Sequence, residues 1–372
     1  MNAKSTGGNA KIRHLGILTG GGDCPGLNAV IRAIVLTAEQ RGARVLGIRD
    51  GYTGLIHKQY TSLDSASVDD LLQRGGTVLG SSNRGNPFAY MMTIDGEHKP
   101  VDLSDTVIEN YREEGLDGII AVGGDGTLQM TYELSKKGFP AICVPKTIDN
   151  DLMATDVTFG FDTAVGTATE AIDRIRTTAE SHGRLMVVEV MGRNAGWIAL
   201  FSGLAGGVDV ILIPEIPFSM EAIAEKIRQD RGAGKHFSII VVAEGAHERG
   251  GEVVVREMVE DPQEPRRLGG IGSYVGEAIQ ERTGIETRVT ILGHIQRGGT
   301  PSTYDRNLST RFGVRAAMAA IEGHYGNLVA MIKGQINLVP LIKSAKGQRL
   351  VSLDSNFIED ARAIGISFGD DA

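Results

Sequence analysis

The sequence predicts an α/β fold of two domains, each a mainly parallel sheet flanked by helices, with a ligand site in the cleft between them. Short, β-branched-rich apolar runs recur along the 372 residues, as expected of strands buried on both faces of a parallel sheet. Helical patterns separate these runs, which is typical of parallel α/β folds. The 50 glycines are about twice the usual share of roughly 7% and favour tight turns and close backbone approaches to a ligand.

The apolar runs predict the strands, and the stretches between them predict the helices. Apolar residues from Phe161 to Ile175 follow the i, i+3, i+4, i+7 spacing of one buried helix face. The stretch after Asn194 has the same pattern. Polar loops are expected at Ser81–Pro87 and Asp261–Arg267. The runs expected to form strands are Leu15–Leu18, Val45–Ile48, Gly118–Val122, Ala141–Val144, Leu185–Val190, Val208–Ile213, Phe237–Ala243, Val289–Leu292 and Leu328–Ile332.

Composition excludes several classes of protein. The net charge of −8 argues against nucleic acid as a partner, because binding to a phosphate backbone needs a clustered positive surface. The sequence contains no run of about 18 apolar residues, so no membrane span is predicted. The polar Met1–Lys11 segment lacks the apolar region of a secretory signal. We interpret Cys24 and Cys143 as reduced core or loop thiols of a cytoplasmic protein.

Glycine, carboxylate and arginine residues gather immediately after the predicted strands. Ligands of open parallel sheets bind at the carboxyl ends of the strands, so this gathering predicts one cleft lined by phosphate-binding and acid–base groups. The segments concerned are 19–26, 123–127, 145–151, 191–194, 244–245 and 293–299.

Gly123–Thr127, with the sequence Gly-Gly-Asp-Gly-Thr, is the first candidate phosphate site. Adjacent glycines bring backbone N–H groups close to phosphate oxygens, and the following helix presents its N-terminus to the anion. Asp125 is suited to Mg²⁺, which favours carboxylate and phosphate oxygens. The motif alone is equally typical of an ordinary strand–helix turn in which an aspartate caps the helix.

Thr147–Asp151 places two carboxylates, Asp149 and Asp151, beside Lys146 and Thr147. One carboxylate can accept a hydroxyl proton while the other helps to place a metal ion. Alone, the segment is better explained as a turn rich in Asp and Asn that caps a helix. Its position after the Gly123–Thr127 loop favours the functional interpretation.

Four arginines near predicted strand ends are suited to bidentate binding of phosphate. Any one of them alone is better explained as a solvated surface residue. His294 is either a ligand contact or a hydrogen-bonded structural residue, while Trp197, Met186 and Met191 are expected in the core. The arginines are Arg184, Arg193, Arg288 and Arg297.

The motifs in this order resemble the bacterial-type 6-phosphofructokinases over nearly the whole chain. Each motif is weak alone, and the ordered set is highly specific. The matching segments are 18–28, 50–52, 74–77, 123–127, 147–151, 171–174, 188–193, 292–299 and 304–306. The resemblance implies phosphoryl transfer to the C1 hydroxyl of fructose 6-phosphate by a homo-oligomer, usually a tetramer with shared active sites. It also implies a phosphate-donor-binding domain (1–159 plus about 295–345) and a sugar-phosphate-binding domain (160–294 plus about 346–372), between which the chain crosses more than once.

The resemblance also implies a role for each matched residue. Asp149 is the general base, Asp125 binds Mg²⁺ with help from Asp151, and Arg193 stabilises the transferring group. Arg184 and Arg288 reach into the site of a neighbouring subunit to bind the sugar phosphate. The donor phosphates fall to Gly22, Arg84, Gly124, Asp125, Gly126, Thr127 and Lys146, and fructose 6-phosphate to Thr147, Asp149, Met191, Gly192, Arg193, Glu244, His294 and Arg297.

The chain departs from the family pattern at the donor site. ATP-dependent bacterial members carry glycine in place of Lys146, and pyrophosphate-dependent members carry lysine there together with aspartate in place of Gly126. We favour ATP, because the absent side chain at Gly126 leaves room for the nucleotide. Pyrophosphate is the second candidate, and ADP as donor stays open. Arg84 stands in for a family arginine that lies slightly earlier.

An effector site with fewer cations is also expected. Arg32 and Arg176 match arginines that bind ADP or phosphoenolpyruvate in regulated members of the family, but Leu36 and Ser65 replace two others. Losing two cations weakens an anion site, so no activation by ADP is predicted there.

Two other functions share some of these sequence features. Kinases of NAD and of lipids share the Gly-Gly-Asp-Gly-Thr loop but lack the Thr147–Asp151 and His294–Arg297 segments. A non-catalytic sensor of sugar phosphate and nucleotide is expected to have lost Asp149 or Asp125, and both are present.

Overall fold

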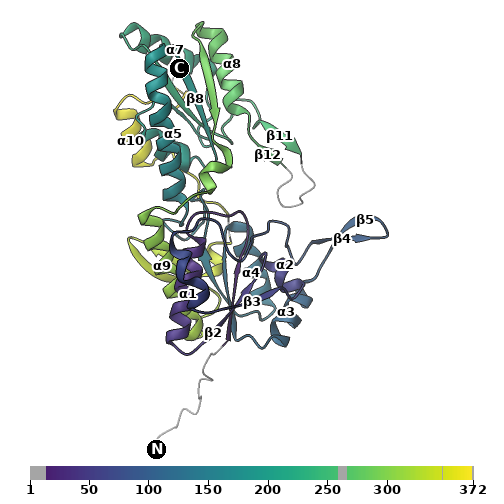
Figure 1. Cartoon of the computed structure of the whole chain (residues 1–372). Coiled ribbons are helices and arrows are strands. Elements are labelled where there is room, and N and C mark those ends of the chain that lie inside the picture. The colour runs from purple at the N-terminus through teal and green to yellow at the C-terminus, as the bar shows by residue number, and fades with distance from the viewer. Residues whose placement is uncertain (1–13, 259–265, 346, 371–372) are drawn as a thin grey trace, which may run out of the picture. The chain divides into compact units, whose positions relative to one another are not determined.

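A computed structural model describes residues 14–258, 266–345 and 347–370. The chain divides into two compact units, which are described separately (Figure 1). Unit 1 comprises Met1–Pro145, Ala154–Asp156 and Arg306–Lys346, and unit 2 comprises Lys146–Met153, Val157–Asp305 and Gly347–Ala372. Relative to the expected domain boundaries, residues 146–153, 157–159 and 295–305 group with unit 2 instead of unit 1. Segment 146–153 bonds to Thr158 and to residues 348–349 of that unit.

Unit 1 is built on a seven-stranded sheet in the order β15-β14-β7-β6-β1-β2-β3. The five central strands run parallel, and the edge strands β3 and β15 are antiparallel to their neighbours. The strands are β1 (His14–Thr19), β2 (Arg44–Ile48), β3 (Tyr60–Leu63), β6 (Gly118–Gly123), β7 (Ala141–Pro145), β14 (Asn327–Ile332) and β15 (Gln335–Pro340).

Helices flank this sheet, and a separate hairpin extends from the unit. The hairpin consists of β4 (Tyr90–Ile94) and β5 (Glu97–Val101), which pair only with each other among the described strands (Figure 1). The helices are α1 (Leu27–Gln40), α2 (Tyr52–Ile56), η1 (Ala66–Gln73), α3 (Ser104–Glu113), α4 (Asp125–Lys136), α9 (Thr303–Ile321) and η3 (Leu341–Lys343).

The pairing register of β1 and β6 places two predicted phosphate loops side by side. Thr19, the last residue of β1, pairs with Val122 near the end of β6. Gly20, the first residue after β1, donates its N–H to the carbonyl of Val122 at 2.9 Å. The loops that follow the two strands therefore leave the sheet at the same edge.

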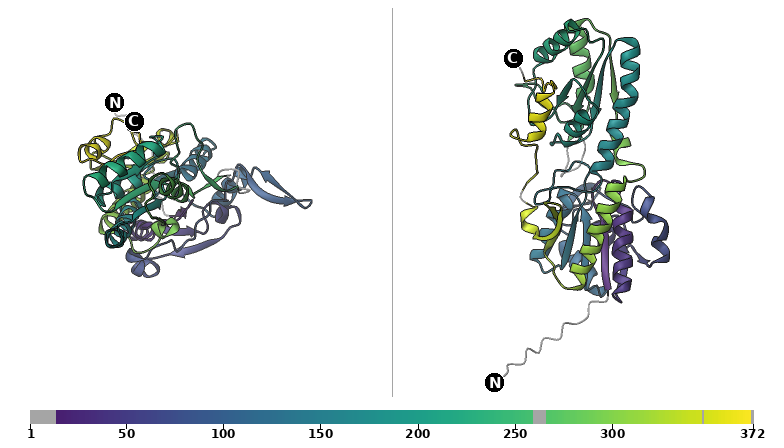
Figure 2. Two further views of the ribbon diagram at one scale, coloured as in Figure 1. Left: turned by 90° about the horizontal axis from the view of Figure 1, so that it is seen from above. Right: turned by 90° about the vertical axis from the view of Figure 1, so that its left-hand side faces the viewer.

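Unit 2 contains a four-stranded, fully parallel sheet in the order β13-β8-β10-β9. Helices cover both faces: α5 and α6 pack on one, and α7 and α8 on the other (Figure 2). The elements are α5 (Phe161–His182), β8 (Leu185–Val190), α6 (Trp197–Ala205), β9 (Val210–Leu212), α7 (Met220–Gly232), β10 (Ser238–Ala243), β11 (Val255–Met258), β12 (Arg266–Leu268), α8 (Ile271–Thr283), β13 (Thr287–Ile291), η2 (Gly293–Arg297) and α10 (Asn356–Ala363).

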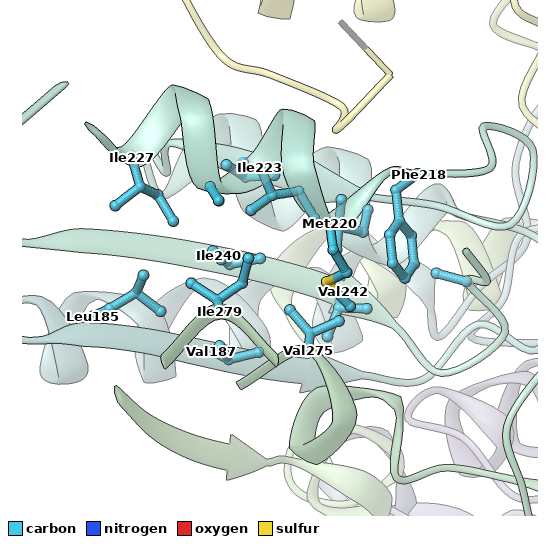
Figure 3. Close-up of a cluster of buried hydrophobic side chains, with 14 of the residues drawn as sticks. Leu185, Val187, Phe218, Met220, Ile223, Ile227, Ile240, Val242, Val275 and Ile279 are labelled. Carbon is cyan, nitrogen blue, oxygen red and sulfur yellow. The ribbon is translucent and has the colours of Figure 1, made fainter. Parts of the chain in front are cut away.

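Alternate residues of β8 and β10 form the core on the α7–α8 side of this sheet. Val187 and Val242 face Ile223 of α7 and Val275 of α8, and all four side chains are fully buried (Figure 3). Because successive strand residues point to opposite faces, the remaining apolar residues of each strand bury against α5 and α6. Burial on both faces explains why these strands are almost wholly apolar.

The predicted strands and helices are confirmed, since every apolar run contains or overlaps a strand of the sheets and Phe161–Ile175 lies within α5. Cys24 and Cys143 are buried and free of disulfide bonds, as expected. Within the described ranges, no helix is both long enough and apolar enough to cross a bilayer.

Two expectations about the fold were wrong. The run Val289–Leu292 is not buried on both faces: it belongs to β13, an edge strand, where Val289 is 37% and Ile291 49% exposed. The expected loop Asp261–Arg267 ends in a strand, because Arg266 and Arg267 pair with β11 in β12. The rest of that loop, 261–265, lies outside the described residues.

Candidate active site

In unit 1, the loops after β1 and β6 enclose the side chain of Thr127. A Cβ atom on Gly20 would lie 2.5 Å from Thr127 Oγ1, and one on Gly123 would lie 2.3 Å from Thr127 Cβ. Both positions therefore exclude any side chain. Thr127 is 2% exposed, and its Oγ1 has no hydrogen-bond partner among the described residues. A buried hydroxyl without a partner costs free energy, which fits a donor reserved for a ligand.

Helix α4 begins at Asp125 with Gly124 as its N-cap, so its first backbone N–H groups are directed out of the loop. Asp125 is partly buried and Gly126 is exposed. The four residues Gly124–Thr127 thus form the first turn of a helix, where the helix dipole favours an anion.

The Ser81–Pro87 loop, predicted as polar, lies against the loop that follows β1. Gly21 donates its N–H to the Ser82 carbonyl at 3.2 Å, and the Ser81 hydroxyl donates to the Gly21 carbonyl. Arg84 is exposed in this loop, and Gly22 directly follows Gly21. The structure therefore brings Gly22 and the loop of Arg84 together.

In unit 2, Thr147 and Asp149 are joined by two hydrogen bonds. The Thr147 hydroxyl donates to Asp149 Oδ2 at 3.3 Å and accepts from the Asp149 N–H at 3.1 Å. Asp149 is 5% exposed, and its Oδ1 accepts no hydrogen bond from the described residues. One carboxylate oxygen is thus fixed by the protein, and the other is buried without a hydrogen-bond partner among the described residues. Lys146, 3% exposed, precedes the pair and forms a bridge with Phe159.

The residue after Asp149 adopts an unusual backbone conformation. Asn150 has φ of 54°, in the left-handed region that asparagine tolerates better than most residues. Its side-chain oxygen accepts from the Thr158 N–H at 3.1 Å, and the Thr158 hydroxyl donates to the Thr147 carbonyl at 2.7 Å. This turn directs Asp149 and Asp151 to their separate positions.

The end of β8 turns sharply into the segment that carries Arg193. Gly192 has φ of 138° and Arg193 φ of 51°. The N–H of Arg193 donates to Glu244 Oε1 at 3.0 Å, which joins the end of β8 to the end of β10. A Cβ on Gly245 would lie 1.8 Å from the Arg193 carbonyl oxygen, so Gly245 is needed for this close approach.

The electrostatics of Glu244 link four of the predicted residues. Burial and the negative charge of Asp149 raise the pKa of Glu244 to about 7, opposed by the hydrogen bond from Arg193 and the charges of Arg193 and Arg297. Asp149, Arg193 and Arg297 therefore lie close enough to act on one carboxyl group. A strongly shifted carboxyl group among charged partners marks a candidate active site.

His294 and Arg297 lie in η2, directly after β13. His294 is exposed and Arg297 partly buried, while Met191, expected in the core, is only partly buried at the end of β8. Trp197 and Met186, by contrast, are buried as expected.

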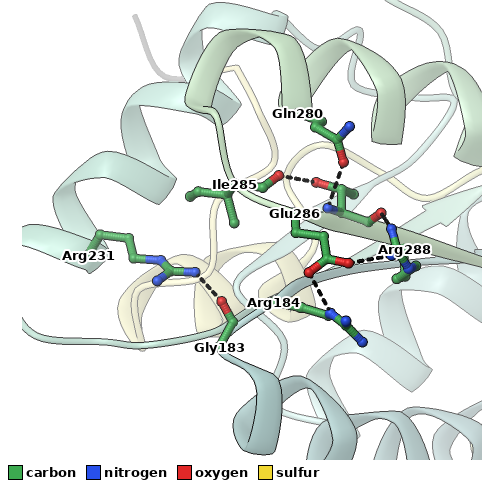
Figure 4. Close-up of polar contacts among 8 residues, drawn as sticks. Gly183, Arg184, Arg231, Gln280, Ile285, Glu286 and Arg288 are labelled. Carbon is green, nitrogen blue, oxygen red and sulfur yellow. Dashed lines mark hydrogen bonds and ion pairs between the residues drawn. The ribbon is translucent and has the colours of Figure 1, made fainter.

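Arg184 and Arg288 do not join this cluster. Arg184 precedes β8 and Arg288 is the second residue of β13, so both lie at the amino ends of the strands, whereas Arg193 and Arg297 follow the carboxyl ends. Both arginines contact Glu286, Arg184 through Nε at 2.9 Å (Figure 4). The two cations lower the pKa of Glu286 below its usual value. All four arginines lie near strand ends, as expected, but this pair lies at the opposite ends from Arg193 and Arg297.

Metal binding was expected at Asp125 and Asp151. Among the described residues, no cluster of three or more His, Cys, Asp or Glu side chains is arranged to hold an ion by itself. Mg²⁺ in phosphate-transfer sites generally takes one or two carboxylates and completes its shell with phosphate oxygens and water. Asp151 is 6% exposed, and its Oδ2 accepts from Gln348 Nε2 at 3.1 Å.

Sequence reasoning missed Gln348 and Arg349, which contact the Asn150–Asp151 turn from the C-terminal part of the chain. They lie almost 200 positions beyond it in sequence. The only local signal is the change from the β15 strand pattern to a basic, polar stretch at 346–349.

The fold and the site together define a two-unit α/β protein. It has a glycine-rich helix N-terminus suited to an anion in one unit and a buried carboxylate near arginines in the other. The phosphofructokinase family model matches residues 14–320. The chain belongs to the phosphofructokinase family.

Individual relatives agree with this assignment. The chain is 50% identical over 362 residues to ATP-dependent 6-phosphofructokinase 2 of Clostridium perfringens (96% of this chain, 99% of the relative). It is 51% identical over 319 residues to the pyrophosphate–fructose 6-phosphate 1-phosphotransferase of Amycolatopsis methanolica (86% and 90%). The solved Saccharomyces cerevisiae phosphofructokinase aligns with a TM-score of 0.75 and 30% identity, over 95% of this chain and 46% of that one.

Proposed function

We propose that this protein is an ATP-dependent 6-phosphofructokinase, which transfers the γ-phosphoryl group of ATP to the C1 hydroxyl of fructose 6-phosphate in cytoplasmic glycolysis. The observation that carries the proposal is the Asp149 carboxylate. One of its oxygens is held by Thr147 and the other is buried with no partner among the described residues. The arginines that act on neighbouring Glu244 supply the positive charge that phosphoryl transfer needs.

Asp149 acts as general base. The Thr147 hydroxyl holds Oδ2, which leaves Oδ1 free to accept a proton. Oδ1 takes the proton of the C1 hydroxyl while the C1 oxygen of the sugar attacks the γ-phosphorus and ADP leaves. Arg193 neutralises charge on the transferring group. The remaining residues proposed to hold fructose 6-phosphate are Met191, Gly192, Glu244, His294 and Arg297.

The first turn of α4 binds the phosphates of the donor. Its backbone N–H groups and the Thr127 hydroxyl donate to phosphate oxygens. Gly22, Arg84 and Lys146 complete this part of the site. Mg²⁺, held by Asp125 with help from Asp151, supplies neutralisation of phosphate charge when it is bound.

Arg184 and Arg288 serve a second copy of the chain. They lie at the strand ends opposite to Arg193, so the site of their own unit 2 is at the far end of β8. We propose a homotetramer in which these two arginines bind the sugar phosphate of a neighbouring subunit. Glu286 holds both side chains in place until then.

Pyrophosphate is the second candidate donor, because Lys146 matches pyrophosphate-dependent members and relatives of both kinds are about 50% identical to this chain. Gly126 favours ATP. It is exposed in the first turn of α4 and has no side chain to occupy the space that a nucleotide needs.

The test is the formation of fructose 1,6-bisphosphate from fructose 6-phosphate and Mg²⁺, with ATP, ADP and pyrophosphate supplied in parallel. We expect turnover with ATP and little with pyrophosphate. Preferential use of pyrophosphate would mean that Lys146 decides the donor. No turnover with any of the three would reject the proposal in favour of a non-catalytic sensor.

A further inference from the structure

The C-terminal segment of unit 2 contacts the turn that follows the proposed base. Gln348 contacts Asp151, and Arg349 contacts Asn150. They lie beyond residues 14–320, the part of the chain that the family model matches. The family motifs therefore assign them no role.

Arg349 binds the backbone of this turn through several groups. Its Nε and Nη2 atoms donate to the Asn150 carbonyl at 3.2 and 2.8 Å, and its own N–H donates to the Asp151 carbonyl at 2.7 Å. Two side-chain donors on one carbonyl fix both the position and the direction of that peptide group.

Trp197 holds Arg349 in this orientation. The guanidinium carbon lies 4.5 Å from the centre of the Trp197 ring, and the indole N–H donates to the Arg349 carbonyl at 2.8 Å. Stacking and the hydrogen bond together restrict the arginine to one conformation. A planar group that can stack and donate twice is a property of arginine that lysine lacks.

The peptide group that Arg349 binds belongs to the left-handed residue Asn150. A non-glycine residue in this region persists when its surroundings hold it there. Thr158 binds the Asn150 side chain from one side, and Arg349 binds its carbonyl. Gln348 fixes Asp151 Oδ2 at 3.1 Å and in turn accepts from the Asn194 amide at 3.1 Å.

We propose that Arg349, assisted by Gln348, is a positioning residue for phosphoryl transfer. Arg349 stabilises the left-handed turn at Asn150 and so aims the preceding Asp149 carboxylate at the acceptor hydroxyl. This inference rests on the proposed function, because it assumes that Asp149 is the base. Arg349 itself touches neither substrate nor donor in this account.

The kinetic test compares Arg349→Ala, Arg349→Lys and a matched control, Leu350→Ala, which removes an adjacent side chain that is 48% exposed. Misaiming a catalytic group by about 1 Å lowers the rate by up to roughly 100-fold. We expect kcat of Arg349→Ala to fall roughly 10- to 100-fold with little change in KM for fructose 6-phosphate. Arg349→Lys should recover part of the loss, and Leu350→Ala should match the wild type. A lower melting temperature with unchanged kcat per folded enzyme would overturn the proposal.

A second readout does not depend on activity. Trp197 is the one tryptophan of the chain, so its emission reports whether Arg349 is stacked on it. We expect changed emission in Arg349→Ala and faster amide hydrogen exchange within 147–152, both absent in Leu350→Ala. Unchanged exchange in 147–152 would overturn the proposal, whether or not the wild type is active. A wild type without activity would by itself reject only the proposed function. If Arg349→Ala does not fold, Gln348→Leu is tested in its place by measuring kcat and amide exchange within 147–152.

Discussion

The backbone N–H of Arg193 donates a hydrogen bond to the carboxylate of Glu244, with 3.0 Å between N and Oε1. This bond joins the carboxyl ends of two neighbouring parallel strands, β8 and β10. It also places Glu244 beside Asp149, whose charge helps to raise the Glu244 pKa to about 7. Glu244 therefore both links two strand ends through its hydrogen bond with Arg193 and interacts electrostatically with Asp149.

Stability should depend on pH through Glu244. Its pKa rises from 4.5 to about 7 on folding, so the folded protein binds this proton more tightly than the unfolded chain does. The resulting stabilisation is fully present below about pH 4.5 and is lost as the pH rises towards 7. The loss amounts to about 3 kcal/mol at most.

Glu244→Gln should therefore flatten the pH dependence of the free energy of unfolding between pH 4.5 and 7. Denaturant titrations at several pH values measure this slope. Part of the slope will remain, because burial also raises the pKa of Asp305, to about 6. The exposed Glu359→Gln is the matched control, and an equal slope in wild type and Glu244→Gln would contradict the assignment.

Replacing the proposed base should abolish most activity while the fold is retained. A positioned general base contributes about 10²–10⁴ in rate, so Asp149→Ser should raise the barrier by roughly 3–6 kcal/mol. Steady-state kinetics with circular dichroism as a folding check measure this. Asp173→Asn, an exposed change on α5, should leave kcat unaltered, and full activity of Asp149→Ser would remove Asp149 from the mechanism.

The space at Gly126 should decide the donor. Gly126→Asp places a carboxylate in the first turn of α4, where the phosphates of the donor are proposed to bind. Juxtaposed like charges cost several kcal/mol, so turnover with ATP should fall on the order of 100-fold. Pyrophosphate turnover should fall less, because pyrophosphate has no sugar or α-phosphate to accommodate. Gln129→Asp adds the same charge at an exposed position one turn later and serves as control. Equal losses with both donors would show that Gly126 does not discriminate between them.

The close packing around Thr127 should make Gly123 irreplaceable. A Cβ there lies 2.3 Å from Thr127 Cβ, so Gly123→Ala must displace the threonine. We expect a higher KM for ATP and a loss of about 1–3 kcal/mol in stability. Gly166→Ala in α5 meets no described heavy atom within 4 Å beyond its own local backbone and should stabilise the helix by up to about 1 kcal/mol. Unchanged ATP kinetics in Gly123→Ala would separate Thr127 from donor binding.

ADP should not activate the enzyme through the family's effector site. Leu36 and Ser65 replace two arginines there, and the Arg176 guanidinium donates to the carbonyls of Gly206 and Gly207. Titration with ADP at low fructose 6-phosphate is expected to leave the rate unchanged, and strong activation would refute this. The double variant L36R/S65R, which restores two cations, is the variant expected to gain a response.

Strands with an apolar run could be predicted from the sequence, including the parallel edge strands β9 and β13, whereas the antiparallel edge strands β3 and β15 could not. β6 and β10 are buried on both faces and therefore almost wholly apolar. β3 and β15 lie at the sheet edge, where polar residues are tolerated, so no apolar run identifies them. The β4–β5 hairpin was missed for the same reason, since most of its residues are exposed.

The predicted site residues follow a similar division. Thr127 lies in a motif whose residue order indicates a strand, a turn and a helix, and Asp149 lies in a polar turn directly after a predicted strand, so sequence could identify both. Arg349 has no such motif, and its role depends on contacts with Asn150 and Trp197 that only the folded chain creates. Arg184 and Arg288 were recognised as arginines near strand ends, but only the sheet reveals at which end they lie.

The most direct test follows the γ-phosphoryl group of ATP in a reaction with purified protein, Mg²⁺ and fructose 6-phosphate. ³¹P NMR identifies the product and the carbon to which the new phosphate is attached. We predict fructose 1,6-bisphosphate, phosphorylated at C1, formed in equal amount with ADP by the wild type and at a strongly reduced rate by Asp149→Ser. ATP left intact, or hydrolysed without phosphorylation of the sugar, would contradict the account.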